Sequence, residues 1–156
     1  MKKEYPCLIG PGFHDLKPEE LTALLKKHHP RPKTRREIWG RYQAFLRRLQ
    51  TVGISFEVWV AGSFITEKPD PADVDTVVSA SKDLVDSLPQ PQAAVLTELL
   101  LPSNHPIVKA RYFTDAYFFF SEDEERERYW MGQFGFFRTK KAKGVARFVL
   151  NPDLVV

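Results

Sequence analysis

Residues 58–78, with the sequence VWVAGSFITEKPDPADVDTVV, hold the pattern that decides the fold of this chain. The stretch 54–61 alternates as a strand does, and Gly62-Ser63 ends it abruptly. A proline-rich loop follows, and residues 73–79 have the composition of a second strand. The pattern therefore predicts two consecutive strands separated by residues 64–72.

Three aspartates are the candidate ligands of a divalent cation. Asp73 and Asp75 are two residues apart on a predicted strand, so both carboxylates point to one face. Two like charges side by side are costly unless a cation lies between them, and magnesium prefers such oxygens. Asp115 interrupts the apolar stretch 110–120 (ARYFTDAYFFF), which predicts a third strand, and it is the best candidate for a third ligand. The three residues predict a site for two magnesium ions, or manganese in their place.

The glycine and serine after the first strand are the candidate phosphate ligands. A strand that ends in Gly62-Ser63 and turns into a helix presents free backbone N–H groups and a hydroxyl to an anion. Arg111 is an even number of residues from Asp115, so both would lie on the same face of the predicted strand. Arg111 then either reaches a triphosphate or pairs with that aspartate. Lys140 either contacts the triphosphate or an RNA, or lies in a solvated hairpin loop.

The remaining elements alternate between helix and strand. Apolar residues at helical spacing predict a helix over 34–52, opened by a Thr34/Glu37 capping box, with arginines on its outer face. The other expected elements are a turn-rich arm over 1–16, a helix over 18–27, a linker over 28–33, a helix over 90–100, a helix from a Ser121/Glu124 capping box to about 131, and a strand over 144–150. We expect one α+β domain over 1–156, with a mixed sheet flanked by helices.

Composition excludes several classes of protein. The single cysteine, Cys7, leaves no disulfide framework and no cysteine-based zinc site. No apolar run approaches a membrane span and no signal peptide is visible, so we expect a cytoplasmic protein without a membrane partner. The net charge of +3 is weak evidence for a nucleic-acid partner. The clusters of basic residues are either solvated surfaces or a surface that binds phosphates or RNA. The four histidines lack metal-like spacing and receive no role.

The stretch 58–78 is similar to the signature of the DNA polymerase β-like nucleotidyltransferase superfamily. That signature is an apolar strand, Gly-Ser or Gly-Gly, a short gap, Asp-x-Asp, and a third carboxylate on a later strand. The whole chain, including its tail 129–150 (YWMGQFGFFRTKKAKGVARFVL), also resembles a small bacterial and phage family of nucleotidyltransferase-like proteins. Thr76 departs from the apolar residue that often follows Asp-x-Asp in the superfamily.

The resemblance implies a role for each of these residues. Gly62 and Ser63 would hold the β- and γ-phosphates of a nucleoside triphosphate, and Asp73 and Asp75 would bind both magnesium ions. Asp115 would bind the ion that activates an acceptor hydroxyl and would accept its proton. The acceptor stays open among RNA or tRNA, a protein and a small molecule. The alternatives are an inactive transferase-like binding module of a toxin–antitoxin pair and a basic RNA-binding domain.

Overall fold

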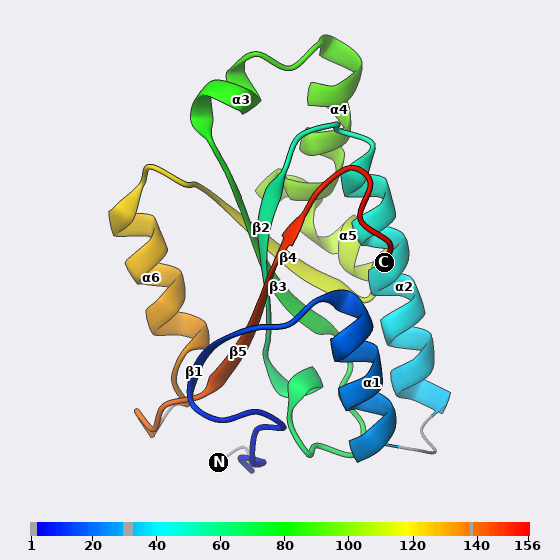
Figure 1. The fold of residues 1–156 in the computed structure, drawn as a ribbon, viewed down its shortest axis with the longest axis vertical. Coiled ribbons are helices and arrows are strands. Elements are labelled where there is room, and N and C mark those ends of the chain that lie inside the picture. Colours follow the sequence, from blue (N-terminus) through cyan, green and yellow to red (C-terminus); the bar gives the residue numbers. More distant parts are fainter. Residues whose placement is uncertain (1–2, 30–32, 138) are drawn as a thin grey trace.

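The computed structural model describes residues 3–29, 33–137 and 139–156. Its elements follow one another as β1 (Gly12–Asp15), α1 (Pro18–His28), α2 (Lys33–Gln50), β2 (Phe56–Ala61), β3 (Val74–Ala80), α3 (Lys82–Asp86), α4 (Gln90–Leu100), α5 (His105–Tyr112), β4 (Thr114–Phe120), α6 (Glu124–Phe134) and β5 (Gly144–Leu150), as Figure 1 shows. Two short 3-10 helices lie at Ser63–Ile65 and Pro102–Asn104. Within the described ranges, no helix is both long and apolar enough to cross a membrane.

The five strands form one mixed sheet in the order β1-β5-β2-β3-β4. The two outer pairs, β1 with β5 and β3 with β4, are parallel, whereas β2 is antiparallel to both of its neighbours. The expected α+β class, with a mixed sheet flanked by helices, is confirmed. The sheet is built around β2 and β3, the two strands that the stretch 58–78 predicts.

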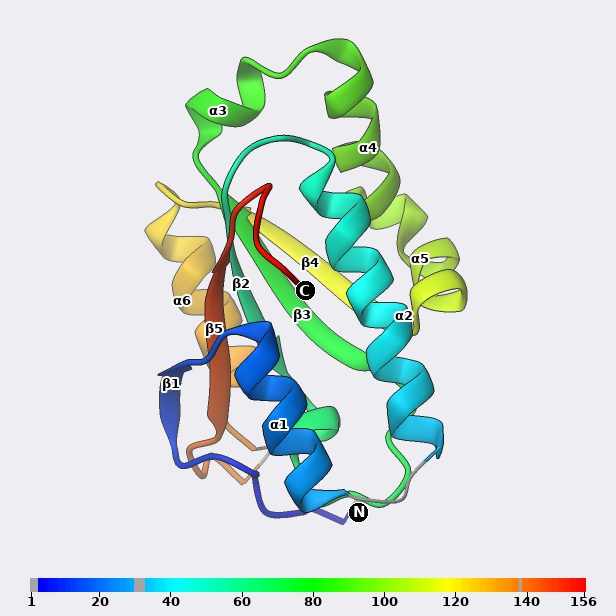
Figure 2. The same ribbon diagram turned by 45° about the vertical axis from the view of Figure 1, so that its right-hand side comes forward.

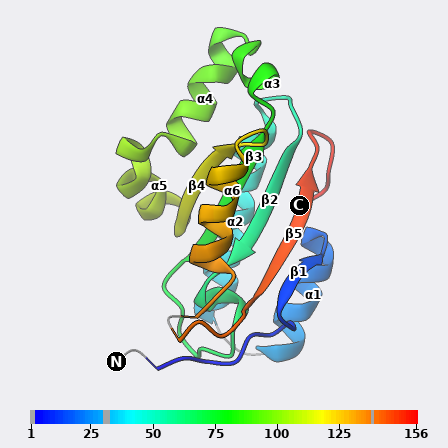
Figure 3. The ribbon, with the colours of Figure 1, turned by 90° about the vertical axis from the view of Figure 1, so that its left-hand side faces the viewer.

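Helices cover both faces of this sheet (Figures 1 and 2). One face carries α1, α2, α4 and α5, whose buried apolar residues form the main core with alternate residues of the strands. Helix α6 covers the opposite face, where Trp130 and Phe134 pack on a smaller cluster that includes Trp59, Val77 and Phe119 (Figure 3). Val77 is two residues from Asp75, so the aspartates predicted as ligands lie on the α6 face.

Helix α2 follows the predicted apolar spacing closely, with two differences. Its predicted core residues are all buried, namely Ile38, Trp39, Tyr42, Phe45, Leu46, Leu49 and Val52. Gly53 follows the helix with φ +86°, a conformation that favours glycine. The helix begins at Lys33, so Thr34 lies inside its first turn instead of capping it. The arginines are not all on the outer face, because Arg35 is buried and 3% exposed.

Three further expectations are wrong in part. The predicted strand 110–120 is divided, because α5 runs to Tyr112 and Phe113 turns the chain with φ +50° into β4. Helix α6 is capped by the side chain of Asp123, which accepts from the Arg126 N–H, and not by Ser121. The N-terminal arm contributes an edge strand, β1, which a short glycine-flanked segment does not predict. Residues 30–32 of the predicted linker lie outside the described residues.

Candidate metal site

The structure brings Asp73, Asp75 and Asp115 together at the N-terminal ends of β3 and β4. Asp75 and Asp115 are direct partners in the parallel register of these strands. Asp73 comes one residue before β3 and shares a face with Asp75. Each residue offers one carboxylate oxygen such that the three oxygens lie within 4.8 Å of one another. We call these three residues the aspartate triad.

Neighbouring carboxylates destabilise the charged forms of Asp73 and Asp75. Burial, followed by the charges of Asp73 and Asp115, raises the pKa of Asp75 to about 7. Burial and the charge of Asp115 also raise the pKa of Asp73 above its ordinary value. The ammonium of Lys143 acts in the opposite direction on the pKa of Asp75. A bound cation would relieve this repulsion, because it favours the ionised form of every carboxylate around it.

Gly62 lies directly against the triad. Its φ of +79° and ψ of −166° form a combination that is essentially restricted to glycine. A Cβ atom at this position would lie 2.1 Å from Oδ2 of Asp75, so a side chain here would force either that carboxyl group or the turn to shift. Ser63 comes next and opens the 3-10 helix Ser63–Ile65. The turn predicted to bind phosphate and the carboxylates predicted to bind metal are therefore in contact.

Arg35 holds the segment that follows this turn. Its guanidinium donates to the carbonyl oxygens of Phe64, Thr66 and Lys68, the last two at 2.9 Å and 2.5 Å. Burial lowers the pKa of Arg35 to about 10, still far above neutral pH, so the group stays charged. The burial of Arg35 could have been predicted from the sequence. Arg35 precedes Ile38 by three positions and therefore lies on the buried face of α2.

Two residues of α5 complete the polar surroundings of the triad, and neither was predicted. His105 Nε2 lies 2.7 Å from Oδ1 of Asp115. Lys109, one helical turn later on the same face, places its Nζ 3.3 Å from Oδ2 of Asp73 and 3.4 Å from Oδ2 of Asp115. The histidines have no role predicted from the sequence, and the structure places one of them, His105, in hydrogen-bond contact with the Asp115 carboxyl group.

The structure places Arg111 on a helix and Lys140 in an exposed turn. Arg111 lies on α5 and not on a strand, so it does not lie on a common strand face with Asp115. Its side chain is exposed, its carbonyl accepts from Arg41, and in the described part of the chain Asp115 pairs instead with His105 and Lys109. Lys140 is exposed in a turn, where its N–H donates to the Phe137 carbonyl.

Aromatic rings line one side of the triad. Tyr117 follows Asp115 by two residues on the same face of β4, and burial raises the pKa of its hydroxyl. The Tyr117 ring centroid lies 5.2 Å from that of His105 and 4.6 Å from that of Trp130 on α6. These ring contacts hold α5, β4 and α6 together on one side of the triad.

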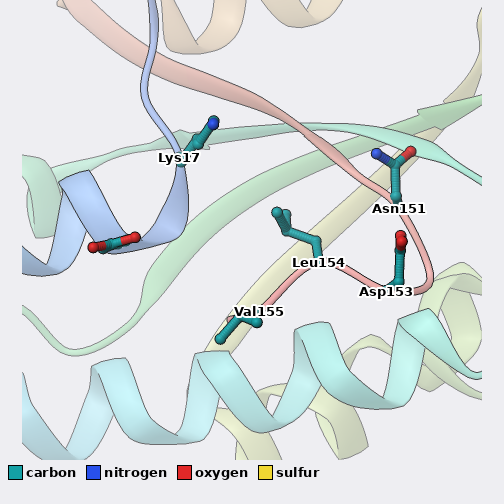
Figure 4. A pocket seen from close by; sticks show the side chains of 6 residues that line it. Lys17, Asn151, Asp153, Leu154 and Val155 are labelled. Atoms are coloured by element: carbon teal, nitrogen blue, oxygen red, sulfur yellow. The ribbon is translucent and has the colours of Figure 1, made fainter.

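Two surface hollows lie away from the triad. One, of about 360 Å³, is lined by residues at the start of α1 and in the C-terminal tail, namely Lys17, Glu19, Asn151, Asp153, Leu154 and Val155 (Figure 4). The other is an open depression on α5 lined by Pro106, Ile107, Ala110 and Arg111. Neither hollow contains a member of the triad or of the Gly62–Ser63 turn.

Comparisons with known proteins place the chain in a family. No curated protein and no solved structure matches the chain. One family model, described as "Family of unknown function (DUF6932)", matches residues 3–149. That match includes the Gly62–Ser63 turn, the triad and both residues of α5 that contact it. The chain therefore belongs to the DUF6932 family.

Proposed function

We propose that this protein is a magnesium-dependent nucleotidyltransferase, which moves a nucleoside monophosphate from a nucleoside triphosphate to a hydroxyl acceptor. One observation carries the proposal: three carboxylates converge within 4.8 Å, and one of them touches a glycine turn that has no room for a side chain. Metal-assisted phosphoryl transfer uses a cation that binds the protein's carboxylates and the substrate's phosphates together, and a turn without a side chain lets phosphate approach the backbone closely.

The residues of the triad fit a hard divalent cation. All three supply carboxylate oxygens, and burial together with mutual repulsion raises the pKa of Asp73 and of Asp75. Magnesium would supply positive charge to the triphosphate and to the acceptor oxygen. His105 engages Oδ1 of Asp115, so a cation at this residue would bind Oδ2, the oxygen that Lys109 contacts in this structure.

The proposed reaction assigns each residue a task. The acceptor oxygen forms a bond to the α-phosphorus, the bond from this phosphorus to the oxygen that bridges to the β-phosphate breaks, and pyrophosphate leaves. Asp115 accepts the proton of the acceptor hydroxyl. Gly62 and Ser63 hold the β- and γ-phosphates through backbone N–H groups and the serine hydroxyl. Asp73 and Asp75 would hold both magnesium ions, and Asp115 would also hold one of them.

The nature of the acceptor is a separate part of the proposal. An RNA or tRNA end, a protein hydroxyl and a small alcohol all offer the same nucleophile. Lys143, whose charge lowers the pKa of Asp75, directly precedes β5 and offers a positive group on this side of the site. An RNA acceptor would be drawn by such charge, and its binding would weaken steeply with added salt.

Transfer of a labelled nucleotide tests the proposal. Purified protein is incubated with magnesium, each α-labelled nucleoside triphosphate in turn, and an extract of cellular RNA and protein. The double variant Asp73→Asn, Asp75→Asn is compared with Asp83→Asn, Asp153→Asn, which removes two exposed carboxylates outside the site. We expect a magnesium-dependent labelled product from wild type and from the control, and none from the triad variant.

Absence of label with every nucleotide, from a folded protein, would refute the proposed activity. That result would favour the alternative of a transferase-like binding module in a toxin–antitoxin pair. A stable complex that survives the triad substitutions, recovered with a defined partner, would then support this alternative.

A further inference from the structure

A protein cation already lies against the oxygens that a metal ion would use. The ammonium of Lys109 is 3.3 Å from Oδ2 of Asp73 and 3.4 Å from Oδ2 of Asp115. Asp73 directly precedes β3 and Asp115 lies in β4, so one side chain bridges two neighbouring segments of the site. Oδ1 of Asp115 is engaged by His105, and the lysine therefore pairs with the oxygen that remains.

A divalent cation and this ammonium cannot share the same carboxylates. Magnesium would bind carboxylate oxygens of the triad directly, and Lys109 already contacts two of these oxygens, Oδ2 of Asp73 and Oδ2 of Asp115. Two cations this close repel each other strongly in a partly buried site, where screening by water is reduced. Binding of the metal therefore requires Lys109 to withdraw.

Lys109 is well placed to withdraw. Its side chain is 51% exposed, whereas the side chains of Asp73 and Asp115 are 18% and 13% exposed. A lysine has a flexible four-carbon stem and a strongly hydrated head group, and exposed ion pairs of lysine are weak. The ammonium can thus turn into water at low cost, while the carboxylates stay in place.

We propose that Lys109 is a built-in counter-cation of the aspartate triad, which a divalent cation displaces when it binds. The inference rests on the proposed function, because it takes the triad as the metal site. In this scheme Lys109 reduces repulsion among the carboxylates, and it also sets the affinity of the site for metal through competition. The lysine is a regulator of the site and not one of its ligands.

Titration with Mn²⁺, followed by electron paramagnetic resonance or calorimetry, tests the competition directly. Lys109→Met removes the charge and keeps most of the stem, Lys109→Arg keeps the charge, and Lys27→Met removes an exposed charge from α1 as a matched control. We expect the Mn²⁺ dissociation constant to fall about fivefold in Lys109→Met, since two weak pairs no longer have to break. Lys109→Arg and Lys27→Met should stay within about twofold of wild type.

Thermal unfolding supplies a second readout. Without metal, Lys109→Met should melt below wild type, because the triad loses its counter-charge, and Mn²⁺ should raise its melting temperature by more than it raises that of wild type. An unchanged or weaker Mn²⁺ affinity in Lys109→Met would overturn the inference, as would tighter binding in Lys109→Arg.

The outcomes separate this inference from the proposed function. If wild type binds no Mn²⁺, the counter-cation role and the metal site fail together. If Mn²⁺ binding follows the predicted pattern and no nucleotide is transferred, the proposed activity fails and the role of Lys109 stands.

Discussion

Replacement of Gly62 by alanine is expected to damage the candidate metal site and leave the rest of the fold intact. The new Cβ would lie 2.1 Å from Oδ2 and 2.8 Å from Cγ of Asp75, far inside van der Waals contact. The backbone at Gly62, with φ +79° and ψ −166°, also disfavours any residue with a side chain. The alanine must therefore push the Asp75 carboxyl group out of the triad or shift the turn that carries Ser63.

Gly62→Ala should have two separate effects, a loss of stability from backbone strain and a loss of metal affinity from the collision with Asp75. Backbone strain of this kind costs roughly 1–3 kcal/mol of stability, which a domain with about 5–15 kcal/mol can tolerate. Displacement of the Asp75 carboxyl group lowers the affinity of the site for a metal ion. Substitution of a residue that merely supports a metal ligand costs roughly 10- to 100-fold in affinity, so displacement of a ligand should cost at least about tenfold.

Gly53→Ala is the matched control for this variant. Gly53 has φ +86°, and a Cβ there would meet no atom within 4 Å, so the control contains strain without a collision. Urea unfolding would measure stability, and titration with Mn²⁺ would measure affinity. We expect both variants to lose stability and only Gly62→Ala to lose Mn²⁺ affinity. Equal Mn²⁺ affinity in the two variants would show that the glycine does not support the site.

Three further predictions concern single side chains. The raised pKa of Asp75 means that the folded state holds an extra proton between about pH 4 and pH 7, so stability falls as pH rises through this window. In EDTA, Asp75→Asn should therefore be more stable than wild type at pH 8, by on the order of 2–4 kcal/mol, with the gap closing toward pH 4 in urea unfolding. Arg35→Met should lose about 3 kcal/mol in the same assay, because carbonyls in 64–68 lose their donors, whereas the exposed Arg36→Met should change little. His105→Ala should weaken Mn²⁺ binding about tenfold, because the third aspartate is no longer oriented, and a result equal to the exposed His28→Ala would contradict that role.

The three aspartates of the triad can be identified from the sequence because each lies in a short pattern with a direct physical meaning. Asp73 and Asp75 have the period of a strand, which places both carboxylates on one face whatever surrounds them. Asp115 stands alone in an apolar stretch, and its charge demands a partner. The register of two parallel strands then brings Asp115 beside Asp75, a pairing that only the folded sheet reveals.

The missed residues depend on contacts that the sequence pattern hides. Helix α5 ends at Phe113, which has φ +50° although it is not glycine, so no ordinary stop signal separates the helix from β4. The aromatic stretch after residue 110 therefore reads as one long strand, and His105 and Lys109 fall outside it. Pro106, in the first turn of α5, was the available signal for the start of this helix.

We propose that the aspartate triad and the Gly62–Ser63 turn bind a divalent cation and a nucleotide together. Its most direct test is anomalous diffraction from crystals grown with Mn²⁺ and a nucleoside triphosphate analogue that cannot be cleaved between its α- and β-phosphates. We expect manganese peaks at the carboxylates of Asp73, Asp75 and Asp115, with the terminal phosphates at Ser63. Manganese or nucleotide bound elsewhere on the protein, with the triad still paired to Lys109, would contradict it.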